Sequence, residues 1–276
     1  MKKILVPCDF SDSATHAFRF AIDLANQSNG EVLLLHVVEL PVMYDTLMMP
    51  SLSFEEVYMK DMKENAEKNF SKIKTKWATD GPKVTSHLEY GATAFTINRF
   101  AKEKKADLIV MGTKGATGIK EIMIGSNTEK IVRTSTVPVI AIKKTSKKPI
   151  KNIVFPNALM ETEEALATQV KALQFFFKAK LHLVYINTPS NFRRDLDTKQ
   201  LLNGFATRYL FKDFTINIYN DMDQESGLIN FAQEMKADMV AMGTHGRMGL
   251  AHLMSGSLAE DVVNHIACPI WTFKKK

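Results

Sequence analysis

The chain has 276 residues, of which 45% are hydrophobic and 24% charged, and its formal net charge is +6. These proportions are typical of a soluble globular protein, and the length fits one large or two ordinary domains. No apolar run reaches the roughly 18 residues that a membrane span needs, and Ile4–Val6 is too short for a signal peptide, so we expect a cytoplasmic protein without a membrane partner.

Much of the positive charge lies in three lysine clusters, at Lys102–Lys105, Lys143–Lys148 and Lys274–Lys276. They could form a nucleic-acid surface, or they could be a helix end, a solvated linker and a tail. No stripe of aromatic and basic residues accompanies the lysines, so we favour the second interpretation and expect no nucleic-acid partner.

The first half alternates strand-like apolar runs with helical patterns. Ser11–Ser13 are good helix starters, apolar residues then recur at helical spacing, and Asn29-Gly30 ends that helix. The expected strands are 3–6, 31–38, 84–90, the apolar run ending at Met111, and 138–142; the further helices are 54–78, 92–104 and 128–133.

Residues 39 to about 53 interrupt this alternation, with two prolines and several methionines. The segment could be a surface loop that packs on its own domain. It could equally be a flexible flap over a ligand, because methionine-rich surfaces adapt to what they contact. The sequence leaves both interpretations open.

The second half repeats the order of the first after a linker at 143–149. Its expected strands are 152–155, 181–186, 214–219, 238–242 and 269–273, and its helices are 161–179, 199–209, 224–236 and 259–263. We therefore expect two domains, 1–144 and 150–276. Alternating strands and helices predict an α/β fold with parallel sheets, which bind ligands at the carboxyl ends of the strands, where the strand order reverses.

One motif occurs once in each half with the same spacing. An Ala-Asp-apolar run ends on Met-Gly, a second glycine follows after two residues, and a Gly-Ser pair follows after nine more. The glycines are Gly112, Gly115 and Gly125 in the first copy and Gly243, Gly246 and Gly256 in the second.

The physics of this motif points to an anion. Glycine permits positive φ and close approach of a ligand, and the following helix presents unpaired N–H groups at the positive end of its dipole. Backbone N–H groups and a serine hydroxyl can then hold phosphate oxygens. A tight turn that merely needs glycine is the alternative, and two identically spaced copies weigh against it.

The motif resembles the universal stress protein family in its ATP-binding branch, and the resemblance covers both halves. It implies two tandem Rossmann-like (HUP-type) domains, each a five-stranded parallel sheet of order 3-2-1-4-5 with helices on both faces. It also implies that strands 138–142 and 269–273 pair as an intramolecular pseudo-dimer, with a homodimer as a further option.

The resemblance also implies an adenine-nucleotide site in the first repeat. Pro7-Cys8-Asp9-Phe10-Ser11 matches the family's end of strand one, and Leu35-His36-Val37 matches the strand that offers backbone contacts to adenine. The implied ATP-binding residues are Pro7, Asp9, Val37, Met111, Gly112, Gly115, Gly125, Ser126 and Asn127. Mg²⁺ would be held largely by the phosphates.

The second repeat keeps only part of this pattern. Its phosphate side survives in Gly243, Gly246, Gly256 and Ser257. The counterpart of Asp9, however, is Ala158, and the counterpart of Asn127 is Leu258. We therefore expect ATP mainly in the first domain, with the ribose and adenine side of the second domain degraded.

No catalytic motif accompanies the glycine loops: the sequence lacks His-Glu-x-x-His, Cys-x-x-Cys and Gly-x-Ser-x-Gly. We expect Cys8 and Cys268 to be small buried residues, and His36 and His182 to be packing residues. Three hypotheses follow: an ATP-binding sensor or regulator of the stress response, which we favour; an interaction protein or small-ligand binder that uses the pseudo-dimer surface; and a slow ATPase or autokinase.

Overall fold

The computed structural model describes residues 1–39, 52–79, 81–113, 125–145, 148–157, 159, 164–244 and 266–274, with 52–58 as backbone only. The first half contains β1 (Lys3–Pro7), α1 (Asp12–Ser28), β2 (Glu31–Val38), α2 (Leu52–Trp77), β3 (Val84–Tyr90), α3 (Thr93–Glu103), β4 (Leu108–Gly112), α4 (Ser126–Thr134) and β5 (Val139–Ile142). The second half contains β6 (Asn152–Pro156), α5 (Glu164–Phe177), β7 (Lys180–Asn187), η1 (Pro189–Asn191), α6 (Asp195–Arg208), β8 (Phe214–Asn220), α7 (Gln224–Glu234), β9 (Met239–Gly243) and β10 (Ile270–Phe273).

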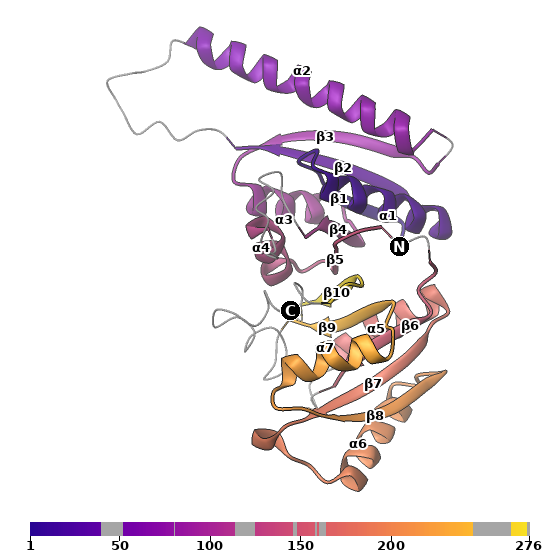
Figure 1. Cartoon of the computed structure of the whole chain (residues 1–276). Coiled ribbons are helices and arrows are strands. Elements are labelled where there is room, and N and C mark those ends of the chain that lie inside the picture. The colour runs from indigo at the N-terminus through magenta and orange to yellow at the C-terminus, as the bar shows by residue number, and fades with distance from the viewer. Residues whose placement is uncertain are drawn as a thin grey trace.

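All the described strands belong to one ten-stranded sheet of order β3-β2-β1-β4-β5-β10-β9-β6-β7-β8 (Figure 1). Within each half the strands are parallel and follow the predicted order 3-2-1-4-5. The halves join where β5 and β10 pair antiparallel, with Trp271 opposite Ile140. The predicted pairing of the last strands is therefore confirmed, and it removes two apolar edges that would otherwise promote aggregation.

Helices cover both faces of this sheet, as predicted. One core cluster contains buried residues of α1, α2, α5 and α6, and the other contains residues of α3, α4 and α7. The inner strands are buried on both faces of the sheet. This is why their sequences are apolar at every position, as in Leu108–Met111, and do not alternate with polar residues. Among the described residues, no helix combines the length and the apolar character that crossing a bilayer requires.

The aspartate of the Ala-Asp repeat has a structural role. Asp107 Oδ2 accepts hydrogen bonds from the backbone N–H groups of Lys2 and Lys3, at 2.5 and 3.0 Å. Asp238 Oδ2 does the same for Lys151 and Asn152, at 3.0 and 2.9 Å. In each half this carboxylate links the start of the fourth strand to the start of the first strand. These two strands are neighbours in the sheet, and the strand order reverses between them.

The element boundaries differ from expectation in places. The helix expected at 128–133 begins at Ser126, the helix expected at 199–209 begins at Asp195, and the short helix η1 was not expected. Most of the segment 39–53 and the whole expected helix 259–263 lie outside the described residues. The boundary between the two domains remains a prediction.

We predict that Trp271→Ala lowers the free energy of unfolding by about 3–5 kcal/mol, because it opens a cavity where the two halves share the sheet. Trp271 is 2% exposed in the first strand beyond the junction. Equilibrium urea unfolding measures the change. The control is Trp77→Ala, at the half-buried end of α2, for which we expect a loss below about 2 kcal/mol. Equal losses for the two variants would contradict a special role for the junction.

Candidate functional site

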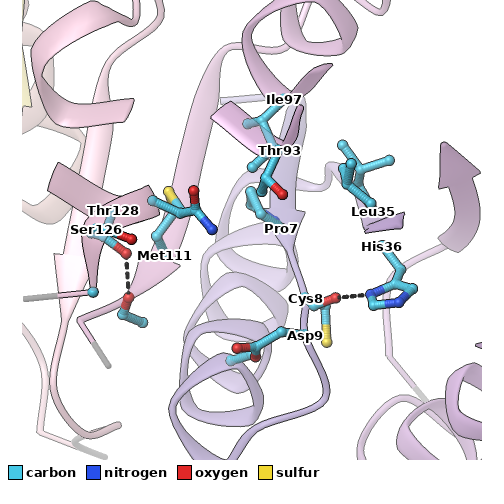
Figure 2. Close-up of a pocket in the computed structure, with 15 residues that line it drawn as sticks. Pro7, Cys8, Asp9, Leu35, His36, Thr93, Ile97, Met111, Ser126 and Thr128 are labelled. Atoms are coloured by element: carbon cyan, nitrogen blue, oxygen red, sulfur yellow. Dashed lines mark hydrogen bonds between the residues drawn. The ribbon is translucent and has the colours of Figure 1, made fainter. Parts of the chain in front are cut away.

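A pocket of about 340 Å³ lies at the carboxyl ends of β1, β2 and β4 in the first half (Figure 2). It is the place where the strand order reverses, since β1 pairs with β2 on one side and with β4 on the other. The site residues predicted for the first half that the structure describes all line it: Pro7, Asp9, Val37, Met111, Gly112, Gly125, Ser126 and Asn127. Gly115 lies outside the described residues.

The end of β1 forms the centre of the pocket wall. The Cys8 N–H donates to the Leu35 carbonyl at 2.7 Å, and His36 Nδ1 is 2.7 Å from the Cys8 carbonyl oxygen. Phe10 then takes a left-handed conformation with φ of 64°, which turns the chain into α1. Asp9 lies in this turn, where Oδ1 accepts from the Ser11 N–H at 3.1 Å. The turn therefore holds the exposed Asp9 carboxylate at the mouth of the pocket.

Gly112 at the end of β4 allows α1 to come very close. A Cβ at this position would lie 2.5 Å from both the carbonyl oxygen and Oγ of Ser13. Any other residue would push the first turn of α1 away from the strand end. Gly112 is thus required by packing.

The start of α4 forms the opposite wall. Its N-cap residue, Gly125, offers no side chain, while the Gly125 N–H donates to the Thr113 carbonyl at 2.6 Å. The Thr128 hydroxyl donates to the Gly112 carbonyl at 2.8 Å and so ties the helix to β4. Gly125 itself makes no side-chain cap, so the N–H groups and the positive end of the helix dipole lie beside Ser126 and Asn127.

A second helix, α3, begins at the same pocket, and Thr93 and Ile97 of α3 line it. Its N-cap residue, Ala92, makes no side-chain cap. Glu39, next after β2, takes that role: its Oε1 accepts from the Thr93 N–H at 3.0 Å and from the Thr93 hydroxyl at 2.5 Å. These hydrogen bonds, together with the charge of Lys130, lower the pKa of Glu39.

Several pocket residues were not predicted from the sequence: Cys8, Ala14, Leu35, His36, Thr93, Ile97 and Thr128. Leu35 and His36 stood in the matched strand end but were not chosen as site residues. Thr93 and Ile97 follow β3, which lies outside the glycine motif, so only the strand order brings them to the pocket. Thr128 could have been found from its place in the first turn of α4.

The pocket offers binding groups rather than a nucleophile. Burial raises the pKa of the Cys8 thiol to about 12, so it stays protonated at neutral pH. The His36 Nδ1 is hydrogen-bonded to the Cys8 carbonyl, and its ring contacts that of Phe10 in a tilted arrangement, with the centroids 4.6 Å apart. Within the described ranges, no group of three His, Cys, Asp or Glu side chains could hold a metal ion.

In the second half the residues at the matching positions of the second strand are buried. By strand register Tyr185 and Ile186 correspond to His36 and Val37. Tyr185 is fully buried and donates to the Asn191 carbonyl at 2.9 Å, and Ile186 is 3% exposed against Gly227, where a Cβ would collide with it. Gly243 ends β9, whereas Gly246, Gly256 and Ser257, with Ala158 and Leu258, lie outside the described residues.

We predict that Gly112→Ala destabilises the protein by about 1–3 kcal/mol, because its methyl group must displace the backbone of Ser13. Thermal and urea unfolding measure this change. Gly204→Ala in α6 is the matched control: a Cβ there meets no atom within 4 Å, and we expect stabilisation by up to about 1 kcal/mol. A neutral Gly112→Ala would show that α1 does not need the close approach.

The similarity to known proteins extends over both halves of the chain. The model of the universal stress protein family matches residues 1–143 and 219–274. Universal stress protein MJ0531 of Methanocaldococcus jannaschii is 34% identical over 147 residues, which cover 53% of this chain and 85% of that protein. The Universal stress protein E homolog of Haemophilus influenzae is 23% identical over 99% of this chain and 97% of its own.

Among solved structures, a universal stress protein from Archaeoglobus fulgidus has the same fold across both halves. It matches with a TM-score of 0.77 at 19% identity and covers 99% of this chain and 98% of its own. The family model covers more than half of the chain, and the fold agrees over its whole length. The chain therefore belongs to the universal stress protein family, with two repeats of the domain in tandem.

Proposed function

We propose that this protein binds one ATP per chain in the pocket of its first half and acts as a cytoplasmic sensor or regulator in the stress response. One observation carries the proposal. The N-terminus of α4, whose N-cap residue is a glycine, meets the glycine end of β4 and the Asp9 carboxylate at a single pocket where the strand order reverses. Membership of the universal stress protein family supports it.

The α4 side of the pocket suits the phosphates. N–H groups at the start of a helix and the Ser126 hydroxyl can donate to phosphate oxygens without the cost of moving a competing side chain, since Gly125 provides none. Gly115 would complete this cradle, and Mg²⁺ would be held mainly by the phosphates themselves.

The β1 and β2 side suits the nucleoside. Pro7, Leu35 and Ile97 supply apolar surface, and Asp9 supplies a carboxylate that can accept a hydrogen bond from a ribose hydroxyl. A volume of about 340 Å³ is within the usual range for small-molecule sites. In this proposal the nucleoside lies on the side of Asp9 and the phosphates lie on the side of α4.

The two halves are not equivalent in this proposal. In the second half Tyr185 and Ile186, which correspond by strand register to the half-buried His36 and Val37, are buried. Its counterpart of Asp9 is Ala158, which cannot accept a hydrogen bond through its side chain. We therefore assign the tight nucleotide site to the first half and at most a weak anion site to the second.

We predict one tight ATP per chain, and an affinity lowered about ten- to a hundredfold in Asp9→Ala, because a hydrogen bond to a charged acceptor contributes about 1.5–3 kcal/mol. Equilibrium dialysis with the full chain at low micromolar ATP gives both stoichiometry and affinity. Asp12→Ala, an exposed carboxylate in the first turn of α1, is the matched control and should bind normally.

Two outcomes would contradict this assignment. Two equal sites per chain would show that the second half binds ATP despite its buried Tyr185 and Ile186. An absence of ATP binding in a folded chain would favour the interaction-protein hypothesis, in which the pocket serves another ligand. A melting curve shows whether Asp9→Ala is folded. If it is not, Asp9→Asn replaces it, because asparagine keeps an oxygen that can accept from the Ser11 N–H.

A further inference from the structure

The ten-stranded sheet ends in two outer strands, β3 and β8, whose sequences differ in charge (Figure 1). β3 contains His87 and Glu89, and Glu89 forms an ion pair with Arg99 at 2.8 Å. Charged side chains on an edge strand oppose pairing with another chain, because pairing would take them out of water. β8, with the sequence Phe-Thr-Ile-Asn-Ile-Tyr-Asn, contains no charged residue and no proline. The β8 edge thus lacks the features that keep an edge strand unpaired.

The outer backbone of β8 has room for a further strand. The Leu181 N–H donates to the Asp213 carbonyl at 3.0 Å, and the Asp221 N–H donates to the Asn187 carbonyl at 3.1 Å. Alternate residues of β8, in step with Asp213 and Asp221, therefore bond to β7, and those between them direct their N–H and C=O groups outward. Within 164–244, a range described without a gap, no group pairs with this outer side. The outward residues are Phe214, Ile216, Ile218 and Asn220.

Exposed apolar side chains surround this edge. Seven large hydrophobic side chains are exposed among the described residues, and five of them lie between positions 192 and 222. Leu210 precedes β8 and is 65% exposed, whereas Met222 follows it and is 78% exposed. Leu196 and Leu201 are exposed on α6, which packs on β8 (Figure 1). Apolar side chains that are exposed together, rather than scattered singly, mark an interaction surface.

The two ends of β8 carry opposite charge. The turn before the strand contains Arg208, Lys212 and Asp213, with a formal charge of +1, and Asp221 and Asp223 follow the strand, with a formal charge of −2. A second copy that pairs antiparallel places the start of its β8 opposite the end of the first, so that unlike charges meet. A parallel copy would bring like ends together. The β8 edge is therefore complementary to itself in the antiparallel direction.

We propose that the β8 edge is the docking surface for a second copy of this chain, with the two β8 strands paired antiparallel about a two-fold axis. The pairing also brings Leu210 of each copy towards Met222 of the partner subunit. It resembles the contact that joins the two halves of one chain, where β5 and β10 pair antiparallel. Each copy uses its edge once, so the assembly closes as a dimer. The pocket lies in the other half, and this inference does not depend on what it binds.

The test measures the association of the full chain by sedimentation equilibrium, from low to several hundred micromolar. Lys212→Glu changes an exposed side chain and makes the start of the strand negative, and Lys102→Glu, an exposed lysine of α3, is its control. Ile218→Pro removes one outward N–H and leaves the hydrogen bonds to β7 in place. Its matched control is Leu88→Pro, at the corresponding position of the β3 edge.

We expect the native chain to dimerise with a Kd of about 1–100 μM, as for a transient interface. Lys212→Glu and Ile218→Pro should each weaken the dimer at least about tenfold, and the two controls should stay within about threefold of the native chain. Amide hydrogen exchange gives an independent readout. On association the outward N–H groups of Ile216 and Ile218 should become protected, whereas that of Asn217, already bonded to β7, should change little.

Three results would overturn the proposal. A native chain that stays monomeric at several hundred micromolar has no such docking surface. A dimer that folded Lys212→Glu and Ile218→Pro form as readily as the native chain uses another surface. Assemblies that keep growing with concentration contradict a closed two-fold pair. If a melting curve shows that Ile218→Pro is unfolded, Lys212→Glu and the exchange at Ile216 and Ile218 decide.

Discussion

The pocket exists because two strands far apart in the sequence, β1 and β4, are held side by side at both ends. At their amino ends Asp107 accepts hydrogen bonds from the N–H groups of Lys2 and Lys3. At their carboxyl ends Gly112 lets the first turn of α1 pack at a distance that no side chain would permit. These two contacts help to bring together the groups at the pocket, which come from three strand ends and three helix starts.

The elements that were predicted correctly are those with a strong local signal. Uninterrupted apolar runs such as Leu108–Met111 predict strands buried on both faces. The same order of runs in the second half independently supports the assignment of these strands. The strand order and the joining of the halves came from the family resemblance instead, because periodicity does not say which strands are neighbours. The short helix η1 was missed since it has no apolar period to reveal it.

The site was predictable where its residues lie within the motif and not where they meet through the fold. Gly112 and Gly125 were selected by the spacing of the repeated motif, and Asp9 by the match of residues 7–11 to the family's end of strand one. Glu39 and Thr93 are 54 positions apart and meet only because β2 and β3 are neighbours. No local pattern marks a glutamate as the cap of a helix that begins after another strand.

A glycine retained in both repeats is weaker evidence for two ligand sites than it first appears. Gly112 is needed for the packing of α1 against β4, whatever the pocket holds. Packing alone is thus enough reason to keep a glycine at the end of the fourth strand, and Gly243 by itself argues for no second ligand. The residues that can distinguish the halves are those without a packing role. Asp9 lies exposed in its turn, whereas Ala158 stands at the matching position. It is this difference in chemistry, and not the shared glycines, on which the proposed assignment of a nucleotide to the first half rests.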